Sequence, residues 1–158
     1  AILAARESFG LEGNLVSDCA CVWPIIESIQ EFAGSIHFMR DPTRGGLAAV
    51  LHEAVSSSNL GIELTESQLP VKPEVAGFTE ILGIDPLYLA CEGRILLIVR
   101  DRDAKPILKR IKETPLGKEA SIIGQVTPRR ESTVVLRNPY GSARSVENMA
   151  GEQLPRIC

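Results

Sequence analysis

The sequence predicts an α+β domain in which helices pack on one mixed sheet. Helical and strand-like segments alternate in the early part of the chain, and two strands are expected to pair with each other near its end. This order is typical of α+β architectures. The 158 residues, 44% hydrophobic and 23% charged, suffice for one domain with its own core.

The first expected helix spans about residues 22–33 and tolerates Pro24 in its first turn. A short strand is expected at 35–39, and the loop 41–46 then leads into a second helix. The apolar face of the first helix comprises Ile25, Ile26, Ile29 and Phe32, and that of the second comprises Leu47, Val50, Leu51, Ala54 and Val55.

The middle of the chain predicts a strand at 61–64, a turn at 69–73 and a helix at about 74–82. Gly83 is expected to end that helix as a C-terminal cap. An irregular segment, 85–91, follows.

The almost continuously apolar run 94–100 predicts a central strand covered on both faces. Asp101 or Asp103 is expected to cap the next helix. Two more strands are expected at 121–126 and 133–137. That helix carries Ile107, Leu108 and Ile111, and the turn-like residues 127–130 join the two strands.

Composition excludes several classes of function. The net charge of -3 gives no basic footprint, and with only 4% aromatic residues there is little to stack on bases, which argues against a nucleic-acid partner. No apolar run approaches the ~20 residues of a membrane span, and no secretion signal is recognisable. The expected location is the cytoplasm.

All four cysteines, Cys19, Cys21, Cys91 and Cys158, are expected to be reduced thiols because their spacing is irregular and a chain of this length does not need disulfides. The C-x-C pair lacks a second pair, so it indicates structural cysteines, and no metal site is predicted.

Cys158 is the last residue and follows a tail that starts at Gly151. Prenylation requires a cysteine four residues from the end, so a lipid anchor is not indicated. An extended tail could carry the thiol on the order of 25 Å. The cysteine is either incidental at a frayed terminus or a carrier of a covalent group.

The loop 41–46 has the parts of an anion site. Gly45 and Gly46 allow backbone N–H groups to approach a phosphate or carboxylate at a helix N-terminus, Arg44 offers a bidentate fork, and Asp41 could hold a cation or cap the helix. Ordinary turn chemistry is the alternative explanation of the two glycines.

Glu92 lies between an apolar stretch and an expected buried strand. Such a position can raise the pKa of a carboxyl group and create a general base, unless the carboxylate simply reaches water. Neither His37 nor His52 has an evident partner in the sequence, and neither is assigned a role.

Several motifs together resemble the C-terminal half of the HypE family of [NiFe]-hydrogenase maturation proteins, in the aminoimidazole ribonucleotide synthetase (PurM-like) superfamily. The resemblance covers nearly the whole chain, and the terminal Pro-Arg-Ile-Cys is its most specific element. The motifs are Asp-Pro-Thr-Arg-Gly-Gly-Leu-Ala at 41–48, Pro-Val-Lys-Pro-Glu-Val at 70–75, Leu-Gly-Ile-Asp-Pro-Leu-Tyr-Leu-Ala-Cys-Glu-Gly at 82–93, Ile-Ile-Gly-Gln-Val at 122–126 and the tail 151–158.

The resemblance implies a three-layer α/β/α fold and the synthesis of a cyanide ligand. A carbamoyl group on Cys158 is dehydrated with ATP to a thiocyanate, and Glu92 is the candidate base. The loop residues Asp41, Thr43, Arg44, Gly45 and Gly46 are expected to contact the nucleotide, with ATP and Mg²⁺ held mainly by an absent N-terminal domain.

The implied partners are the carbamoyltransferase HypF, the HypC–HypD scaffold complex and a second copy in a homodimer. The expected organisation is a PurM-like domain at 1–149 and a flexible tail at 150–158, and the fragment alone is expected to be inactive. One departure is Cys91-Glu92-Gly93, where family members mostly have Asn-Glu-Gly.

Two other readings stay open. The chain could be a partner-docking module without chemistry, or a PurM-like synthetase for a ribonucleotide or selenide. The terminal cysteine argues against the synthetase, because diffusible substrates need no tethered thiol.

Overall fold

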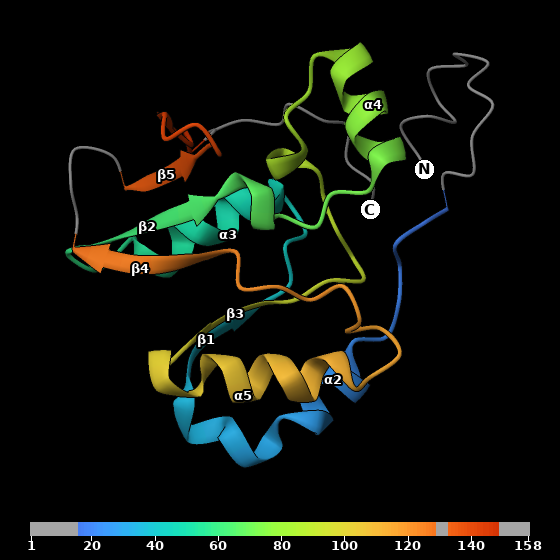
Figure 1. Ribbon diagram of the computed structural model, residues 1–158, viewed down its shortest axis with the longest axis vertical. Helices are drawn as coiled ribbons and strands as arrows, with labels where there is room; N and C mark the ends of the chain where they lie inside the picture. Colours follow the sequence, from blue (N-terminus) through green and yellow to red (C-terminus); the bar gives the residue numbers. More distant parts are fainter. Residues whose placement is uncertain (1–15, 129–132, 149–158) are drawn as a thin grey trace.

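The computed structural model describes residues 16–128 and 133–148 of the chain (Figure 1). Its larger sheet is mixed and has the strand order β4-β2-β5-β6. The central strand β2 pairs antiparallel with β4 and parallel with β5, and β6 pairs antiparallel with β5. These strands are β2 (Leu60–Thr65), β4 (Gly124–Pro128), β5 (Val134–Arg137) and β6 (Ala143–Ser145).

A second, two-stranded antiparallel sheet joins β1 (Ile36–Arg40) to β3 (Leu96–Val99). Four α-helices and three short 3₁₀ helices complete the described fold. They are α2 (Trp23–Ser28), η1 (Gln30–Ser35), α3 (Gly46–Val55), η2 (Glu66–Gln68), α4 (Pro73–Leu82), η3 (Pro86–Tyr88) and α5 (Asp101–Lys112).

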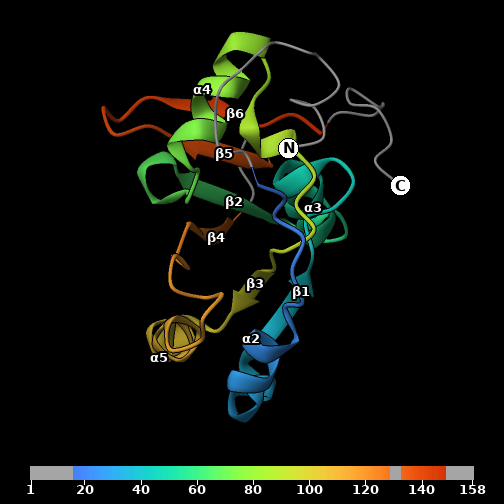
Figure 2. The same ribbon diagram turned by 90° about the vertical axis from the view of Figure 1, so that its right-hand side faces the viewer.

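Two hydrophobic clusters meet at strand β3. The larger cluster packs α3, η3 and the four-stranded sheet around Leu51, Leu64 and Val134. The smaller cluster packs α2 against α5. Leu96 is buried in the larger cluster and Leu97 packs, partly buried, against the smaller one, so apolar side chains cover both faces of the strand. Figure 2 shows the resulting order, with α4 at one end of the molecule and α2 and α5 at the other.

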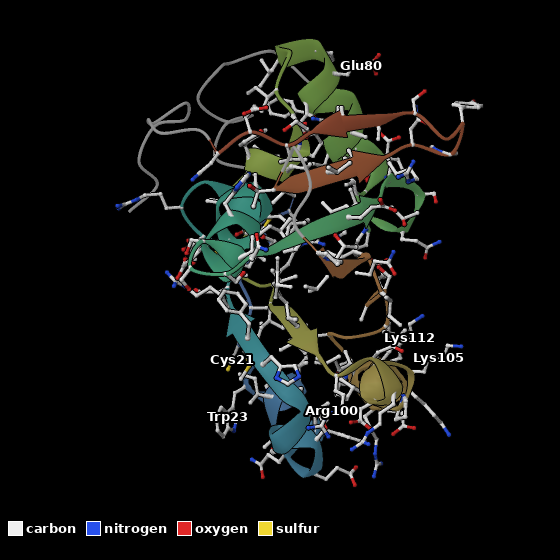
Figure 3. All side chains as sticks on the ribbon, turned by 90° about the vertical axis from the view of Figure 1, so that its left-hand side faces the viewer. Cys21, Trp23, Glu80, Arg100, Lys105 and Lys112 are labelled. Carbon is white, nitrogen blue, oxygen red and sulfur yellow. The ribbon has the colours of Figure 1, made fainter. Side chains whose placement is uncertain are left out.

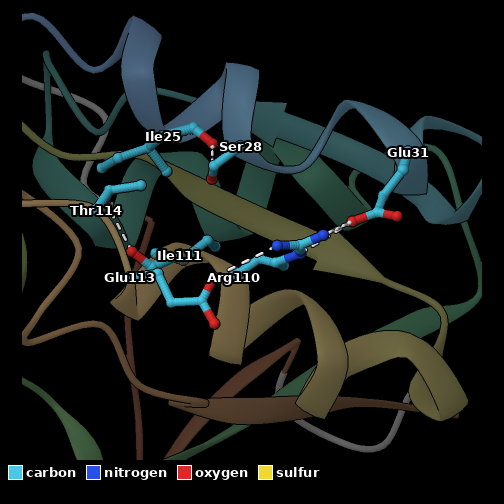
Figure 4. Close-up of polar contacts among 7 residues, drawn as sticks. All are labelled: Ile25, Ser28, Glu31, Arg110, Ile111, Glu113 and Thr114. Atoms are coloured by element: carbon cyan, nitrogen blue, oxygen red, sulfur yellow. Dashed lines mark hydrogen bonds and ion pairs between the residues drawn. The ribbon is translucent and has the colours of Figure 1, made fainter.

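Polar contacts close the α2–α5 end (Figure 4). The Arg110 guanidinium lies 2.9 Å from the Glu31 carboxylate and 3.5 Å from that of Glu113. Thr114 ends the helix by donating its hydroxyl proton to the Ile111 carbonyl oxygen at 2.7 Å. These contacts lie at the surface, so burial of Ile107 and Ile111 carries most of the packing.

The expected α+β class with a mixed sheet is confirmed, and so is the helix that Gly83 ends. Gly83 has φ 65°, and the N–H of Ile84 donates to the Thr79 carbonyl oxygen at 2.9 Å. A left-handed residue with this hydrogen bond is the usual glycine cap.

Several expectations about local elements are wrong. The first helix ends at Ser28, and a 3₁₀ helix replaces its second half. The apolar strand β3 is covered on both faces but is not central, since within the described residues it pairs with β1 alone. The strands expected at 121–126 and 133–137 do not form a hairpin, because β2 lies between β4 and β5.

The expected aspartate cap of α5 is also wrong. The residue before the helix is Arg100, and no side chain caps it. The Asp103 carboxylate instead accepts a hydrogen bond from the Ser35 hydroxyl at 2.6 Å, which ties the helix to η1. A carboxylate in the first turn still favours the helix through its dipole.

Within residues 16–128 and 133–148, no helix is both long enough and apolar enough to cross a membrane.

Candidate functional site

The loop 41–46 connects β1 to α3 and depends on its two glycines. Gly45 and Gly46 have φ values of 75° and 62°, a region that other residues rarely adopt. A Cβ on Gly46 would lie 2.5 Å from the carbonyl oxygen of Leu87 and 2.6 Å from that of Leu89. Only glycine therefore lets the start of α3 lie directly against the backbone around η3.

The loop also contacts the segment that carries the candidate base. The backbone N–H of Cys91 donates to the carbonyl oxygen of Pro42 at 2.9 Å. Pro42 is buried. The loop 41–46 and the segment 91–93 are thus joined by a backbone hydrogen bond, and Glu92 follows directly after Cys91, which makes that bond.

A third segment crosses this pair at Gly93. A Cβ on Gly93 would lie 1.7 Å from the carbonyl oxygen of Asp18 and 3.0 Å from the backbone nitrogen of Ala20. The sequence alone did not indicate that the segment 18–20 is part of the site. The glycine beside Glu92 was the one available signal, because close backbone approach is a common reason for a glycine.

Cys91 lies at the centre of these three segments. Burial raises the pKa of its thiol, and the neighbouring Asp18 carboxylate raises it further through charge and a hydrogen bond. The Sγ atom lies 3.5 Å from the Leu89 carbonyl oxygen. The thiol is consequently protonated at neutral pH, which makes it a poor nucleophile.

Polar loop side chains are accessible to a ligand. Asp41 and Arg44 are exposed, and the Asp41 carboxylate lies 3.8 Å from the Arg40 guanidinium. Thr43 is half-buried, and its carbonyl oxygen accepts the Gly46 N–H at 3.0 Å. The described residues give Arg44 no hydrogen bond or ion pair, so its guanidinium is available for binding.

Glu92 does not have the burial that the sequence suggested. It lies in the turn at 92–93, four residues before β3 begins, and its side chain is exposed. The apolar stretch before it is only half-buried, and the strand begins at Leu96. Any desolvation of this carboxylate has to come from groups outside the described residues, such as a bound substrate.

Cys158 and the tail from 149 lie outside the described residues, so their positions are not tested. The preceding backbone is held firmly. His52 on α3 lies with its Nε2 2.7 Å from the Val146 carbonyl oxygen, and the Tyr88 hydroxyl donates to the Glu147 carbonyl oxygen at 3.0 Å. His52, which had no assigned role, thus binds the backbone just before the tail.

Of the other described cysteines, Cys19 lies within the 18–20 segment that crosses Gly93, and Cys21 follows that segment. Cys19 and Cys21 are exposed, and Figure 3 shows Cys21 near Trp23 at the start of α2. His37 is exposed on β1. In the part of the chain that the structure describes, no three His, Cys, Asp or Glu side chains gather as a metal-binding group.

Comparison with known proteins defines the class. Residues 1–137 match the family model described as AIR synthase related protein, C-terminal domain, and the chain belongs to this family.

Within the class, the chain is similar to the carbamoyl dehydratase HypE of Escherichia coli (strain K12). The two are 44% identical over 157 residues, which is 99% of this chain and 46% of that protein. The chain therefore spans about half the length of the curated relatives it matches.

Solved structures agree with this similarity. A crystal structure of E. coli HypE matches with a TM-score of 0.90 at 43% identity, covering 99% of this chain and 48% of that one. HypE in complex with ATP matches at 0.90 and 35% identity, covering 100% and 48%. A HypE–HypF complex matches at 0.88 and 37% identity, covering 93% and 48%.

Proposed function

We propose that this chain is the C-terminal half of a carbamoyl dehydratase that makes the cyanide ligand of [NiFe] hydrogenases. The similarity to E. coli HypE over 99% of the chain carries the proposal. In this proposal residues 1–149 form the PurM-like domain, 150–158 form the carrier tail, and an N-terminal domain completes the protein.

The reaction begins with a carbamoyl group on the Cys158 sulfur. The amide oxygen attacks the γ-phosphorus of ATP, ADP leaves, and one N–H proton is lost. The resulting phosphorylated imidate loses its second N–H proton and expels phosphate, which leaves a thiocyanate on the same sulfur. ATP is needed because an amide oxygen is a poor leaving group until it is phosphorylated.

Glu92 is proposed as the base that takes an N–H proton. Its exposed carboxylate can be reached by a tethered substrate, and the tail could desolvate it on arrival. The Glu92 carboxylate only removes a proton in this step. It does not need to attack the carbamoyl carbon, because that carbon is already bonded to the Cys158 sulfur.

The loop 41–46 is proposed to contact the nucleotide phosphates. Arg44 would pair with phosphate oxygens, and the backbone at Gly45 and Gly46 would approach them at the N-terminus of α3, with Thr43 adding a hydroxyl. The solved structure of HypE in complex with ATP supports a nucleotide as the ligand of this loop.

Of the described acidic residues in this loop, Asp41 alone could serve Mg²⁺. One carboxylate does not complete a magnesium site, so most ligands would come from phosphates, water and the N-terminal domain. No step above depends on a metal contact from this chain.

The proposed donor of the carbamoyl group is HypF, in line with the HypE–HypF complex. The proposed acceptor of the cyano group is the HypC–HypD complex, and the full-length protein is proposed to be a cytoplasmic homodimer.

Mass spectrometry of the full-length protein tests the function. Incubation with carbamoyl phosphate, the carbamoyltransferase and ATP should place first a carbamoyl and then a cyano group on the peptide that ends in Cys158. The Cys158→Ala variant should gain neither. An adduct on that variant, or hydrogenase maturation supported by Cys158→Ser, would exclude the carrier role and favour a docking module.

A further inference from the structure

The backbone just before the tail is held by side chains from separate elements. We call residues 144–148 the tail root. Arg144 in β6 forms an ion pair with Asp85 beside η3. The Val146 N–H donates to the Val134 carbonyl oxygen at 2.9 Å, and the Val146 side chain is 1% exposed.

Two further contacts act on backbone carbonyl groups of the root. His52 Nε2 lies 2.7 Å from the oxygen of Val146, and the Tyr88 hydroxyl donates to the oxygen of Glu147 at 3.0 Å. A carbonyl oxygen can only accept, so the His52 Nε2 carries the proton. Consecutive carbonyls bound from two elements fix the direction of the chain as well as its position.

These contacts exceed what holding the strand requires. All three residues of β6 are exposed, and the strand pairs only with β5 at the sheet edge. Burial of Val146 and its hydrogen bond to β5 would already hold the end of the fold. The contacts from Asp85, Tyr88 and His52 add a constraint on the chain path.

The same elements also form the loop 41–46. His52 lies six residues after Gly46 on α3, which is about 9 Å along the helix axis. Tyr88 lies between Leu87 and Leu89, whose carbonyl oxygens line the space at Gly46. The tail root and the candidate phosphate loop are therefore two ends of one packed unit.

We propose that His52 and Tyr88 are positioning residues that fix the point from which the tail carries Cys158. This inference rests on the proposed carrier function of the tail. Cys158 lies ten residues beyond Asn148, so at about 3.3–3.6 Å per residue it can lie at most roughly 35 Å from that residue. A root fixed in the same packed unit as the loop keeps the thiol within that reach, and so at a higher effective concentration at the loop than a freed root would.

Release of the root lowers that concentration. Val146 remains buried and bonded to β5 without these two side chains, so only 147–148 are freed. The tether then lengthens from ten to about twelve residues, and effective concentration falls with roughly the −3/2 power of linker length, or about 1.3-fold. Loss of the fixed starting direction adds to this factor. We expect the rate of dehydration of the carbamoylated protein to fall about two- to fivefold overall.

The test compares variants of the full-length protein. Single-turnover dehydration on Cys158 should be about two- to fivefold slower in Tyr88→Phe/His52→Ala, with an unchanged KM for ATP. Tyr88→Phe/His52→Gln should recover part of the rate, because the glutamine amide can donate to the same carbonyl. Ser121→Ala is the matched control, since it removes a 2.6 Å side-chain hydrogen bond to the Gln68 carbonyl oxygen away from the root.

A distance measurement tests the positioning without the reaction. Spin labels on Cys158 and on Lys109→Cys, in a Cys19→Ser/Cys21→Ser/Cys91→Ser background, should give a broader distance distribution in the double variant than with His52 and Tyr88 intact. An unchanged distribution together with an unchanged rate overturns the inference. If the unmodified protein gains no carbamoyl group at all, the proposed function fails, and the label distribution alone decides the role of the root.

Discussion

The backbone N–H of Cys91 donates to the carbonyl oxygen of Pro42 at 2.9 Å, joining two segments that are almost 50 residues apart in the chain. The proposed nucleotide loop and the proposed base are thereby parts of one surface. Because the bond uses backbone groups, it does not require asparagine at position 91. This accounts for how the chain keeps the local path with a cysteine there.

Gly46→Ala should disrupt this surface. The new methyl group would meet carbonyl oxygens at 2.5 and 2.6 Å, and φ 62° is strained for alanine. We expect a loss of about 3 kcal/mol or more in the free energy of unfolding, measured by urea denaturation.

Gly77→Ala is the control for this change. Gly77 lies within α4, and no atom lies within 4 Å of a Cβ placed there. The alanine should be neutral or stabilise by up to about 1 kcal/mol, because glycine is unfavourable in helices. Equal effects of the two substitutions would contradict the packing described at Gly46.

Asp18→Asn should make the Cys91 thiol more reactive. Burial raises the pKa of this thiol most, and the Asp18 charge adds to it, so removing the charge should lower the pKa. In a Cys19→Ser/Cys21→Ser/Cys158→Ser background, alkylation by iodoacetamide at pH 8 should become a few-fold faster. Alkylation at an unchanged rate would show that Asp18 does not act on the thiol.

The same pKa shift predicts a pH dependence of stability. A thiol with a raised pKa keeps its proton in the folded state while the unfolded thiol ionises above about pH 8.5. The folded state then binds more protons, so its stability should fall as the pH rises from there toward the folded pKa. Comparing urea titrations of the protein with those of Cys91→Ala between pH 7 and 10 isolates this contribution.

Local signals in the sequence were enough for several elements. The helix α4 and its cap at Gly83 could be predicted because proline at the start and glycine at the end act through their own backbone. The anion-loop parts at 41–46 were recognisable for the same reason. Strand β3 was predicted to be covered on both faces because its residues are apolar in succession.

Long-range pairing could not be predicted in the same way. Nothing local indicates that β2 lies between β4 and β5, since this depends on which edges are buried together. Asp101 or Asp103 was expected to cap α5, but the Asp103 carboxylate accepts a hydrogen bond from the hydroxyl of Ser35, 68 residues away. The exposure of Glu92 and the crossing of Gly93 by 18–20 likewise depend on tertiary placement.

Arg44→Ala should weaken nucleotide binding in the full-length protein. Its exposed guanidinium has no partner among the described residues, so its removal leaves no buried charge behind. Loss of one charged hydrogen bond to phosphate is worth about 1.4 kcal/mol, or roughly a tenfold higher KM for ATP. Arg102→Ala, at an exposed position on α5, should leave the KM unchanged. A normal KM in both variants would place the nucleotide elsewhere.

Glu92→Gln should separate loading of Cys158 from dehydration. Glutamine keeps the size of the side chain but cannot accept a proton, so the carbamoyl adduct should form normally and then persist. Removal of a general base typically slows a reaction by about 10² to 10⁴.

Glu80→Gln is the matched control, because Glu80 is also exposed but lies on α4, away from the loop (Figure 3). Single-turnover mass spectrometry reports both steps. If Glu92→Gln converts the carbamoyl group to a cyano group as fast as Glu80→Gln does, another group removes the proton and Glu92 is only a surface residue of the turn before β3.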